Sequence, residues 1–280
     1  DLRFRGCGSD FGDNDRLVQA IKNAGNVILV EELVDSRAIA DLPYQMSEQP
    51  ELCNFESLST KNLNQDGNQY YFNESTGLHG AWYRSVLSMI ADAALATAPF
   101  VLPRGVVTYH WTFKEDAGGI PLLPAVVLQV FALDVIDELA YLLQEIDPMI
   151  SLDRLAASDK DIEIEALMYE LRGRFVEAPT LKDQFIYALN QKNGIDAQTK
   201  RLLQALVELY AGHEKHYLNF YGPPRTIRTI PYYQVLQQNP LQNRPLNLKG
   251  KVVFVGVSAA KFGEQDKLRD DYTTVFKQSD

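Results

Sequence analysis

The sequence has little cysteine, no long hydrophobic run and no excess of positive charge. Its 280 residues include only 2 cysteines, Cys7 and Cys53, and 4 histidines. Two cysteines are too few for a disulfide scaffold, and without a Cys-x-x-Cys pair they form no zinc knuckle. In an oxidising compartment they could form one disulfide, and otherwise they are two unrelated buried thiols; the sequence leaves both open.

The charge balance is acidic, with a net charge of −10. Nucleic-acid binding needs a positive field, so this balance argues against a nucleic-acid partner and against docking on an anionic membrane surface. No stretch approaches the roughly 20 apolar residues that span a bilayer. The chain opens with Asp1-Leu2-Arg3-Phe4, without an initiator Met or a signal-like segment, which is typical of an excised or processed piece.

Helical and strand-like segments alternate along the chain. A helix after a cap at Asp13 ends at Gly25 and leads into a buried strand over residues 26–30. Further expected elements are a strand at 70–72 within a polar loop over 35–79, a helix over 80–97, a strand over 106–113 and a long helix over 122–144. This order predicts a mixed α/β fold, with a mainly parallel sheet covered by helices in three layers.

Residues 146–212 are predicted to be a helical insertion or subdomain. The sequence Asn193-Gly194 separates its last two helices, and Asp196 is the expected cap of the third. The apolar positions follow helical spacing in three stripes: Ile164, Leu167, Met168 and Leu171; Phe185, Ile186 and Leu189; Leu202, Leu203, Leu206, Val207 and Tyr210.

The most distinctive stretch runs from His216 to Ala260. Two runs of β-branched and aromatic residues, Tyr217–Tyr221 and Val252–Val257, flank a proline-rich connection, and glycines stand at the expected turns, Gly222 and Gly256. The second run has no polar alternation, which predicts a strand buried on both faces, as in a helix-covered parallel sheet.

The sequence contains no recognisable active site. His213 and His216 lack a third ligand, so ordinary surface histidines are favoured over a metal site. Ser258 stands after a strand, but Ala260 replaces the second Gly of a nucleophile elbow and no His follows it.

Two arginines and Ser258 are the candidate ligand-binding residues. Arg225 and Arg228 could meet an anion at the ends of the strands, where open α/β sheets bind ligands. The alternative is a solvated pair, because most surface arginines bind no ligand.

Seven segments resemble the second type of CHASE domain, an extracellular sensory module associated with cyclases and histidine kinases. The C-terminal matches are specific: Tyr217–Pro224 (YLNFYGPP), Thr229–Leu236 (TIPYYQVL) and Leu248–Ala259 (LKGKVVFVGVSA). Asp1–Phe4, Asn26–Leu29 and the paired Ala98–Pro103 and Pro121–Pro124 agree in order. The signature residues in these segments are Asn219, Tyr221, Gly222, Pro223, Pro224, Pro231, Gly250 and Gly256.

The resemblance implies one sensory domain over residues 1–280, outside the bacterial cytoplasmic membrane and bracketed by membrane helices. It implies a cytoplasmic output, most often a class III adenylate or guanylate cyclase and otherwise a histidine or Ser/Thr kinase. It also implies a homodimeric receptor and an unknown small-molecule or ionic stimulus, with no cofactor and no catalytic residue in this chain. The rivals are a periplasmic protein or enzyme acting on a small anion, and a structural spacer.

Overall fold

The computed structural model describes most of the chain in eleven stretches. They are residues 11–31, 33–35, 69–72, 79–84, 88–103, 106–148, 150, 163–219, 226–236, 248–256 and 273–274. Backbone contacts divide the chain into two compact units. Unit 1 comprises Asp1–Leu2, Pro103–His110 and Tyr217–Asp280, and unit 2 comprises Arg3–Leu102 and Trp111–His216. The single domain over 1–280 stays a prediction.

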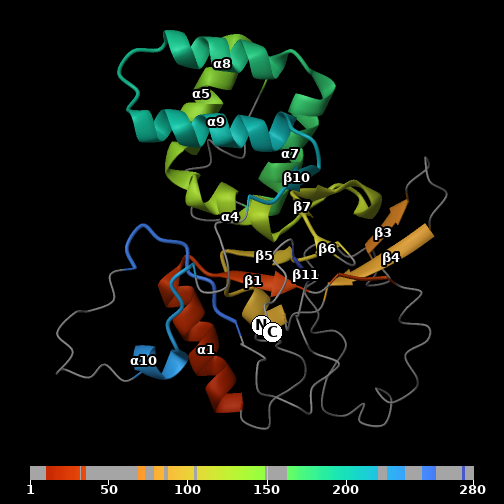
Figure 1. Ribbon diagram of the computed structural model, residues 1–280, viewed down its shortest axis with the longest axis vertical. Helices are drawn as coiled ribbons and strands as arrows, with labels where there is room; N and C mark the ends of the chain where they lie inside the picture. Colours follow the sequence, from red (N-terminus) through yellow and green to blue (C-terminus); the bar gives the residue numbers. More distant parts are fainter. Residues whose placement is uncertain are drawn as a thin grey trace. The chain divides into compact units, whose positions relative to one another are not determined.

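Unit 2 contains a parallel strand pair with helices on both faces. Strand β1 (Ile28–Glu31) pairs with β5 (Ala96–Pro99), with Ile28 opposite Ala96. Successive side chains of a strand point to opposite faces. One face therefore presents Leu29 to helices α1 (Phe11–Ala24) and α3 (Ser88–Ala91), and the other presents Ala98 to α4 (Leu123–Phe131). Figure 1 shows α1 and α4 on opposite sides of the pair.

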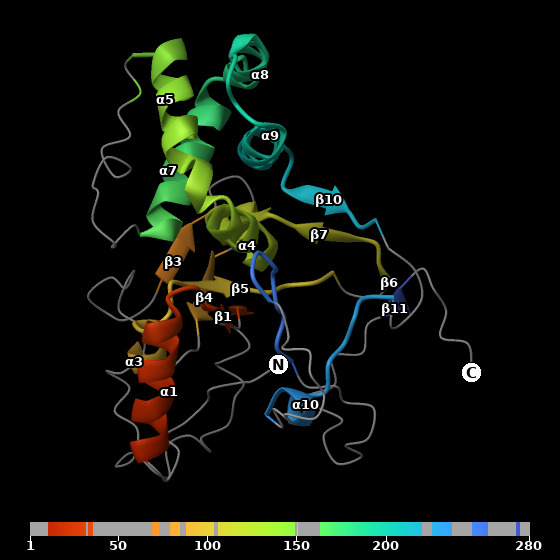
Figure 2. The same ribbon diagram turned by 90° about the vertical axis from the view of Figure 1, so that its left-hand side faces the viewer.

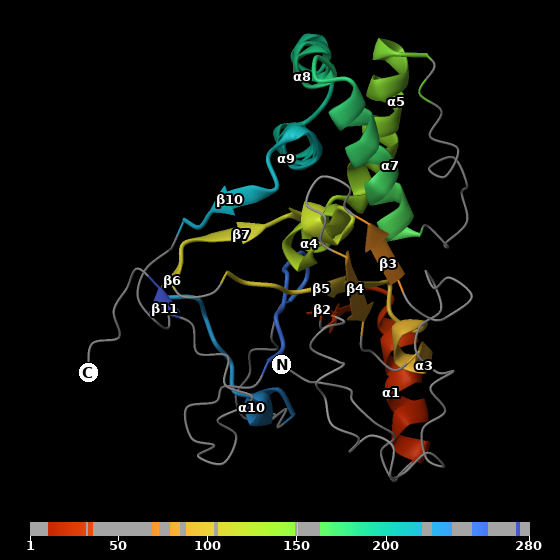
Figure 3. The same cartoon turned by 90° about the vertical axis from the view of Figure 1, so that its right-hand side faces the viewer.

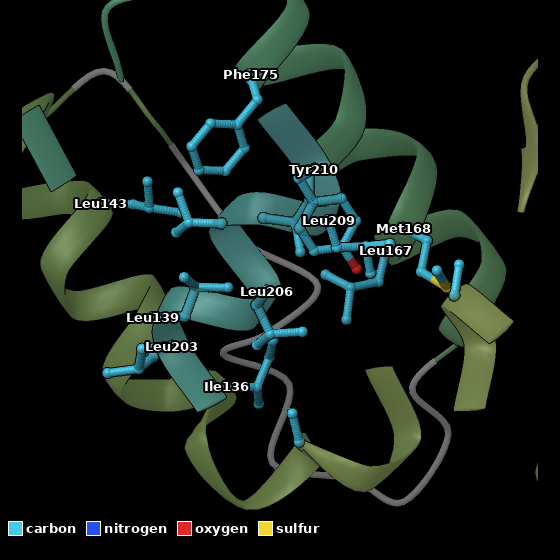
Figure 4. Close-up of a cluster of buried hydrophobic side chains, with 14 of the residues drawn as sticks. Ile136, Leu139, Leu143, Leu167, Met168, Phe175, Leu203, Leu206, Leu209 and Tyr210 are labelled. Atoms are coloured by element: carbon cyan, nitrogen blue, oxygen red, sulfur yellow. The ribbon is translucent and has the colours of Figure 1, made fainter. Parts of the chain in front are cut away.

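Within the described stretches of unit 2, four α-helices follow α4 and form a bundle with it. They are α5 (Ile136–Ile146), α7 (Ile164–Glu177), α8 (Leu181–Gln191) and α9 (Ala197–Ala211). Figures 2 and 3 show these helices together at one end of the unit. Their inward positions form one hydrophobic cluster, and Figure 4 shows side chains from α5, α7 and α9 converging in it.

The bundle confirms the predicted apolar stripes. The inward residues of α7, α8 and α9 are buried, with Ile186 and Leu202 partly buried at the edge of the cluster. Asp196 caps α9 as predicted: its Oδ1 accepts from the backbone amides of Gln198 (2.8 Å) and Thr199 (3.1 Å). The turn before it contains Gly194 at φ 92°, a conformation that favours glycine.

The remaining strands of unit 2 are short. Strands β2 (Leu33–Asp35), β4 (His79–Arg84) and β3 (Gln69–Phe72) form an antiparallel sheet in that order, which includes the strand predicted at 70–72. Strand β8 (Phe113–Lys114) pairs antiparallel with β9 (Ile120–Pro121) around the short helix η2 (Glu115–Ala117). Strands β7 (Tyr109–Trp111) and β10 (Lys215–Tyr217) also pair, and both pass through a boundary between the units.

Unit 1 contains few regular elements among its described residues. Strand β6 (Val106–Val107) pairs parallel with β11 (Thr273–Thr274), and α10 (Tyr232–Leu236) is a short helix. In the parts of both units that the structure describes, no helix is long and apolar enough to cross a membrane.

Several predicted elements are wrong in kind or in length. Residues 80–97 are not one helix, because they contain the end of β4, the single turn α3 and the start of β5. The helix over 122–144 is broken at Ala132, where η3 (Leu133–Val135) separates α4 from α5. The strand over 106–113 is divided into β6, β7 and the start of β8. Helix α1 begins at Phe11, before the predicted cap at Asp13.

The predicted buried strand over 252–257 is also wrong for the residues that the structure describes. Val252–Val255 forms no strand and lies in no sheet, and its side chains are 47–75% exposed. β-branched residues favour a pleated, half-buried surface, so their propensity alone does not supply the neighbouring strand. The strand predicted at 217–221 is displaced as well, because β10 ends at Tyr217. The coarse α/β class holds, but within the described stretches the strands lie in five small sheets, not in one mainly parallel sheet.

Candidate functional site

The predicted ligand-binding residues are not brought together by the described part of the structure. Arg228 is exposed in an irregular segment before α10. Arg225 and Ser258 lie outside the described residues, as do Cys7 and Cys53. An anion site and a disulfide therefore both stay predictions.

The described signature residues lie at the surface of unit 1. Asn219, Pro231, Gly250 and Gly256 are exposed. Gly250 has a φ of 67° in the turn before Lys251, which explains a glycine there because other residues rarely adopt this conformation. The other four signature residues, Tyr221, Gly222, Pro223 and Pro224, lie outside the described stretches.

The paired histidines do not form a metal cluster with other residues in the described stretches. His213 follows α9, and His216 lies in β10. No group of three or more His, Cys, Asp or Glu side chains that could hold a metal is found among the described residues.

A polar cluster at the C-terminus of α9 is centred on Arg172 of α7. Its Nη1 donates to the backbone oxygens of Tyr210 (2.6 Å) and Gly212 (2.7 Å). Helix C-termini leave their last carbonyl groups without intrahelical partners and carry partial negative charge. The guanidinium therefore satisfies the end of α9 in both hydrogen bonding and charge.

Two residues of the neighbouring strand segment complete the surroundings of Arg172. Its guanidinium lies 5.1 Å from the ring centre of Phe113, and its Nη2 lies 3.6 Å from Glu115 Oε1. The Arg172 side chain is only 14% exposed, whereas that of Glu115 is 65% exposed. The ion pair is therefore solvent-screened and weak, and the backbone oxygens and the aromatic face are the main partners of Arg172.

The same strand segment also binds Glu214, which lies three residues after the end of α9. The Thr112 amide donates to the Glu214 backbone oxygen (2.8 Å), and the Thr112 hydroxyl donates to the same oxygen (3.3 Å). The Glu115 amide donates to Glu214 Oε2 (3.3 Å). Residues 112–115 thus contact Arg172 on one side and Glu214 on the other.

Tyr210 connects this cluster with the core. Its ring lies 6.1 Å from that of Phe113 and 6.3 Å from that of Phe175, and its hydroxyl donates to Gln129 Oε1 of α4. Both Tyr210 and Gln129 are fully buried. Burial raises the pKa of Tyr210 well above its ordinary value, so the hydroxyl stays protonated and remains a donor.

The family model described as the CHASE2 domain matches residues 4–276. The chain belongs to the CHASE2 domain family. The resemblance that the C-terminal segments carry is thereby confirmed. No curated protein and no solved structure matches the chain.

CHASE2 domains are sensory extracellular domains of signalling receptors. Their role is sensory and not catalytic. In a sensory domain the relevant property of a polar cluster is how it holds elements together, and the Arg172 cluster of this CHASE2 domain joins α7, the end of α9 and residues 112–115.

Sequence reasoning missed Arg172, Thr112 and Glu115 in this CHASE2 domain. A signal for Arg172 exists, because it lies four residues after Met168 and therefore on the buried side of α7. An arginine on an apolar stripe needs partners for its charge, which marks it as a candidate for a buried cluster. Thr112 and Glu115 carry no such signal, since their roles depend on a partner about 100 residues away.

Proposed function

We propose that this chain is the signal-input domain of a bacterial transmembrane receptor that controls a cytoplasmic class III adenylate or guanylate cyclase. The observation that carries the proposal is the CHASE2 match over residues 4–276, which spans nearly the whole chain. The sensory extracellular character of that family supports a periplasmic location. The acidic balance of the chain, −10 in total, is compatible with a domain that binds no nucleic acid.

The proposed fold of the input domain is a mainly parallel sheet with helices on both faces. The β1–β5 pair supports it, because this pair is parallel and has α4 on one face and α1 with α3 on the other. A two-stranded parallel sheet is unusual alone, since parallel sheets normally have several strands and two covered faces.

The proposed mechanism is a shift between two arrangements of the receptor. A small-molecule or ionic stimulus changes the balance only if it binds one arrangement more tightly than the other. Moving the balance from 1:99 to 99:1 requires a preference of about 10⁴-fold. The proposed output is a class III cyclase, whose catalytic site forms between two chains. The proposed receptor is therefore a homodimer, and the input domain biases its flanking membrane helices.

The experiment uses the full-length receptor in membrane vesicles. A library of small metabolites and ions is first tested for compounds that raise the melting temperature of the 280-residue chain. Cyclic AMP and cyclic GMP formation by the receptor is then measured with each such compound, and with a compound that causes no shift as the control. The proposal predicts that stabilising compounds change cyclase activity. A kinase module in place of the cyclase, or activity indifferent to every stabilising compound, would contradict it.

A further inference from the structure

The connection between α9 and β10 is very short. Helix α9 ends at Ala211 and β10 begins at Lys215, so only residues 212–214 lie between them. The chain then passes from unit 2 into unit 1 at His216. Only three residues can therefore absorb a displacement of α9 before it reaches β10, the strand through which the chain enters unit 1.

Gly212, the first of these three residues, is packed closely against the end of α9. A Cβ atom on Gly212 would lie 2.4 Å from the backbone oxygen of Glu208, in the last turn of α9. Real Cβ atoms essentially never come so close to another heavy atom. The Gly212 amide also donates to that same oxygen (2.9 Å). The backbone is therefore folded tightly against the helix that it leaves.

Arg172 fixes this junction from the side of the bundle. One guanidinium nitrogen bonds the oxygens of Tyr210, inside α9, and of Gly212, beyond it. The Arg172 side chain is only 14% exposed, so separating it from these oxygens leaves a partly desolvated charge without compensation, which costs more free energy than at an exposed site. The end of α9 is thus held to α7 by a contact that opposes sliding between the two helices.

Residues 112–115 close the arrangement from the side of the strands. Phe113 lies against the guanidinium of Arg172, while Thr112 holds the backbone of Glu214. Four pieces of chain therefore form a closed ring of contacts: α7, the end of α9, residues 212–214 and residues 112–115. Each of these four pieces is thus restrained by contacts with at least two of the others.

We infer that Arg172 is a positioning residue that couples the helical bundle to strand β10. With Arg172 in place, a change in the packing of the bundle shifts the start of β10 and thereby the chain that enters unit 1. Without it, the bundle and the strand move independently. The coupling gives the signal of the proposed function a route through the domain. The coupling itself is independent of the proposed function, and only its use for signalling rests on that function.

Hydrogen exchange of two backbone amides in the full 280-residue chain, measured by NMR, tests the coupling. The Thr112 amide, which donates to Glu214, reports on the ring of contacts. The Leu95 amide, which donates to Val27 (2.9 Å), lies in unit 2 outside the ring and reports on unfolding of the whole unit. Arg172→Met is expected to speed exchange at Thr112 by about ten- to a hundredfold, the range for losing a charged hydrogen bond, with Leu95 within about twofold of wild type.

Arg174→Met is the matched control, because Arg174 lies on the same helix outside the described contacts of the ring. It is expected to leave both amides unchanged. Should Arg172→Met fail to fold, Arg172→Lys serves, since a lysine cannot hold both oxygens and stack on the ring in the same way. Equal acceleration at Thr112 and Leu95, or no acceleration at Thr112, would overturn the inference.

Leu189→Ala supplies the coupling test, because Leu189 is a fully buried residue of α8 that does not touch Arg172 in the contacts above. In the Arg172 background it is expected to speed exchange at Thr112 more than at Leu95. In the Arg172→Met background this extra acceleration should vanish; an identical increment in both backgrounds contradicts coupling. Neither measurement uses cyclase activity, so failure of the coupling and failure of the proposed output are separate results.

Discussion

The buried hydrogen bond between Tyr210 and Gln129 gives a sharp test of the core of the bundle. Tyr210→Phe removes the donor and leaves the Gln129 side chain, which is fully buried, with an unpaired oxygen. Its Nε2 already has no hydrogen-bond partner among the residues that the structure describes. A buried polar group that loses its partner costs about 1–3 kcal/mol, so the free energy of unfolding should fall by about that amount.

Replacing both residues separates the cost of the unpaired amide from the value of the bond. The double variant Tyr210→Phe with Gln129→Met removes both polar groups while keeping the side-chain volumes close. Replacing both partners with apolar groups of similar shape is often nearly neutral. The double variant should therefore recover most of the stability that Tyr210→Phe loses.

Denaturant unfolding of the four corners of this cycle is the assay. Tyr187→Phe is the control, because the Tyr187 side chain is 69% exposed and loses an equivalent hydroxyl at the surface. Its effect should stay within about 0.5 kcal/mol. A Tyr210→Phe variant as stable as the control, or a double variant less stable than Tyr210→Phe alone, would contradict the expected cost of the unpaired Gln129 amide.

Three further predictions concern two glycines, a helix cap and an ion pair in the helical part of unit 2. Gly173→Ala should stabilise α7 by about 1 kcal/mol, since a Cβ there meets nothing within 4 Å. Gly212→Ala should instead destabilise the fold by about 1–3 kcal/mol. Thermal unfolding distinguishes the two variants, and equal effects would contradict the geometry. Asp196→Ala should lower the melting temperature at neutral pH: hydrogen bonds from the start of α9 lower the pKa of Asp196, so the stability it contributes is present above the unfolded-state pKa and is lost as pH falls through the folded-state value. A difference between variant and wild type that persists in full at the acidic end would contradict this. The Glu145–Lys192 contact (2.8 Å) lowers the pKa of the glutamate and raises that of the lysine, so its contribution is lost as pH falls through the first or rises through the second; Lys192→Met should abolish the dependence of unfolding on salt that this pair adds, and an unchanged salt dependence would argue against it.

The helices of the bundle could be predicted from the sequence because their signals are local. The spacing of Leu203, Leu206 and Tyr210 defines a buried face within two turns. Asp196 marks the start of the same helix, because its side chain caps amides no more than three residues further along the chain. Each signal lies within the element that it predicts, so no knowledge of distant residues is needed.

The strands could not be predicted equally well, because a strand exists only with a partner. Ala96–Pro99 has weak β propensity, yet it forms β5 because β1 lies beside it. Val252–Val255 has strong β propensity, yet lies in no sheet in the described part of the chain. Tertiary context decides both cases against local preference.

The Arg172 cluster shows the same limit at the level of a site. The sequence places Arg172 on the buried side of α7, which predicts that it has partners. The sequence does not predict that these partners are backbone oxygens at the end of α9, because every residue has a backbone oxygen and none is distinguished by its side chain. The family, in contrast, could be identified from segments such as Leu248–Ala259, which are specific without revealing chemistry.

Cysteine labelling in intact cells tests whether this CHASE2 domain lies outside the cytoplasm, where it would receive its signal. In the full-length receptor, Cys7 and Cys53 are replaced by serine and Tyr187→Cys places one thiol on the exposed face of α8. A maleimide that cannot cross the cytoplasmic membrane is then added before and after that membrane is permeabilised. Full labelling is expected before permeabilisation. Labelling that appears only afterwards would contradict it.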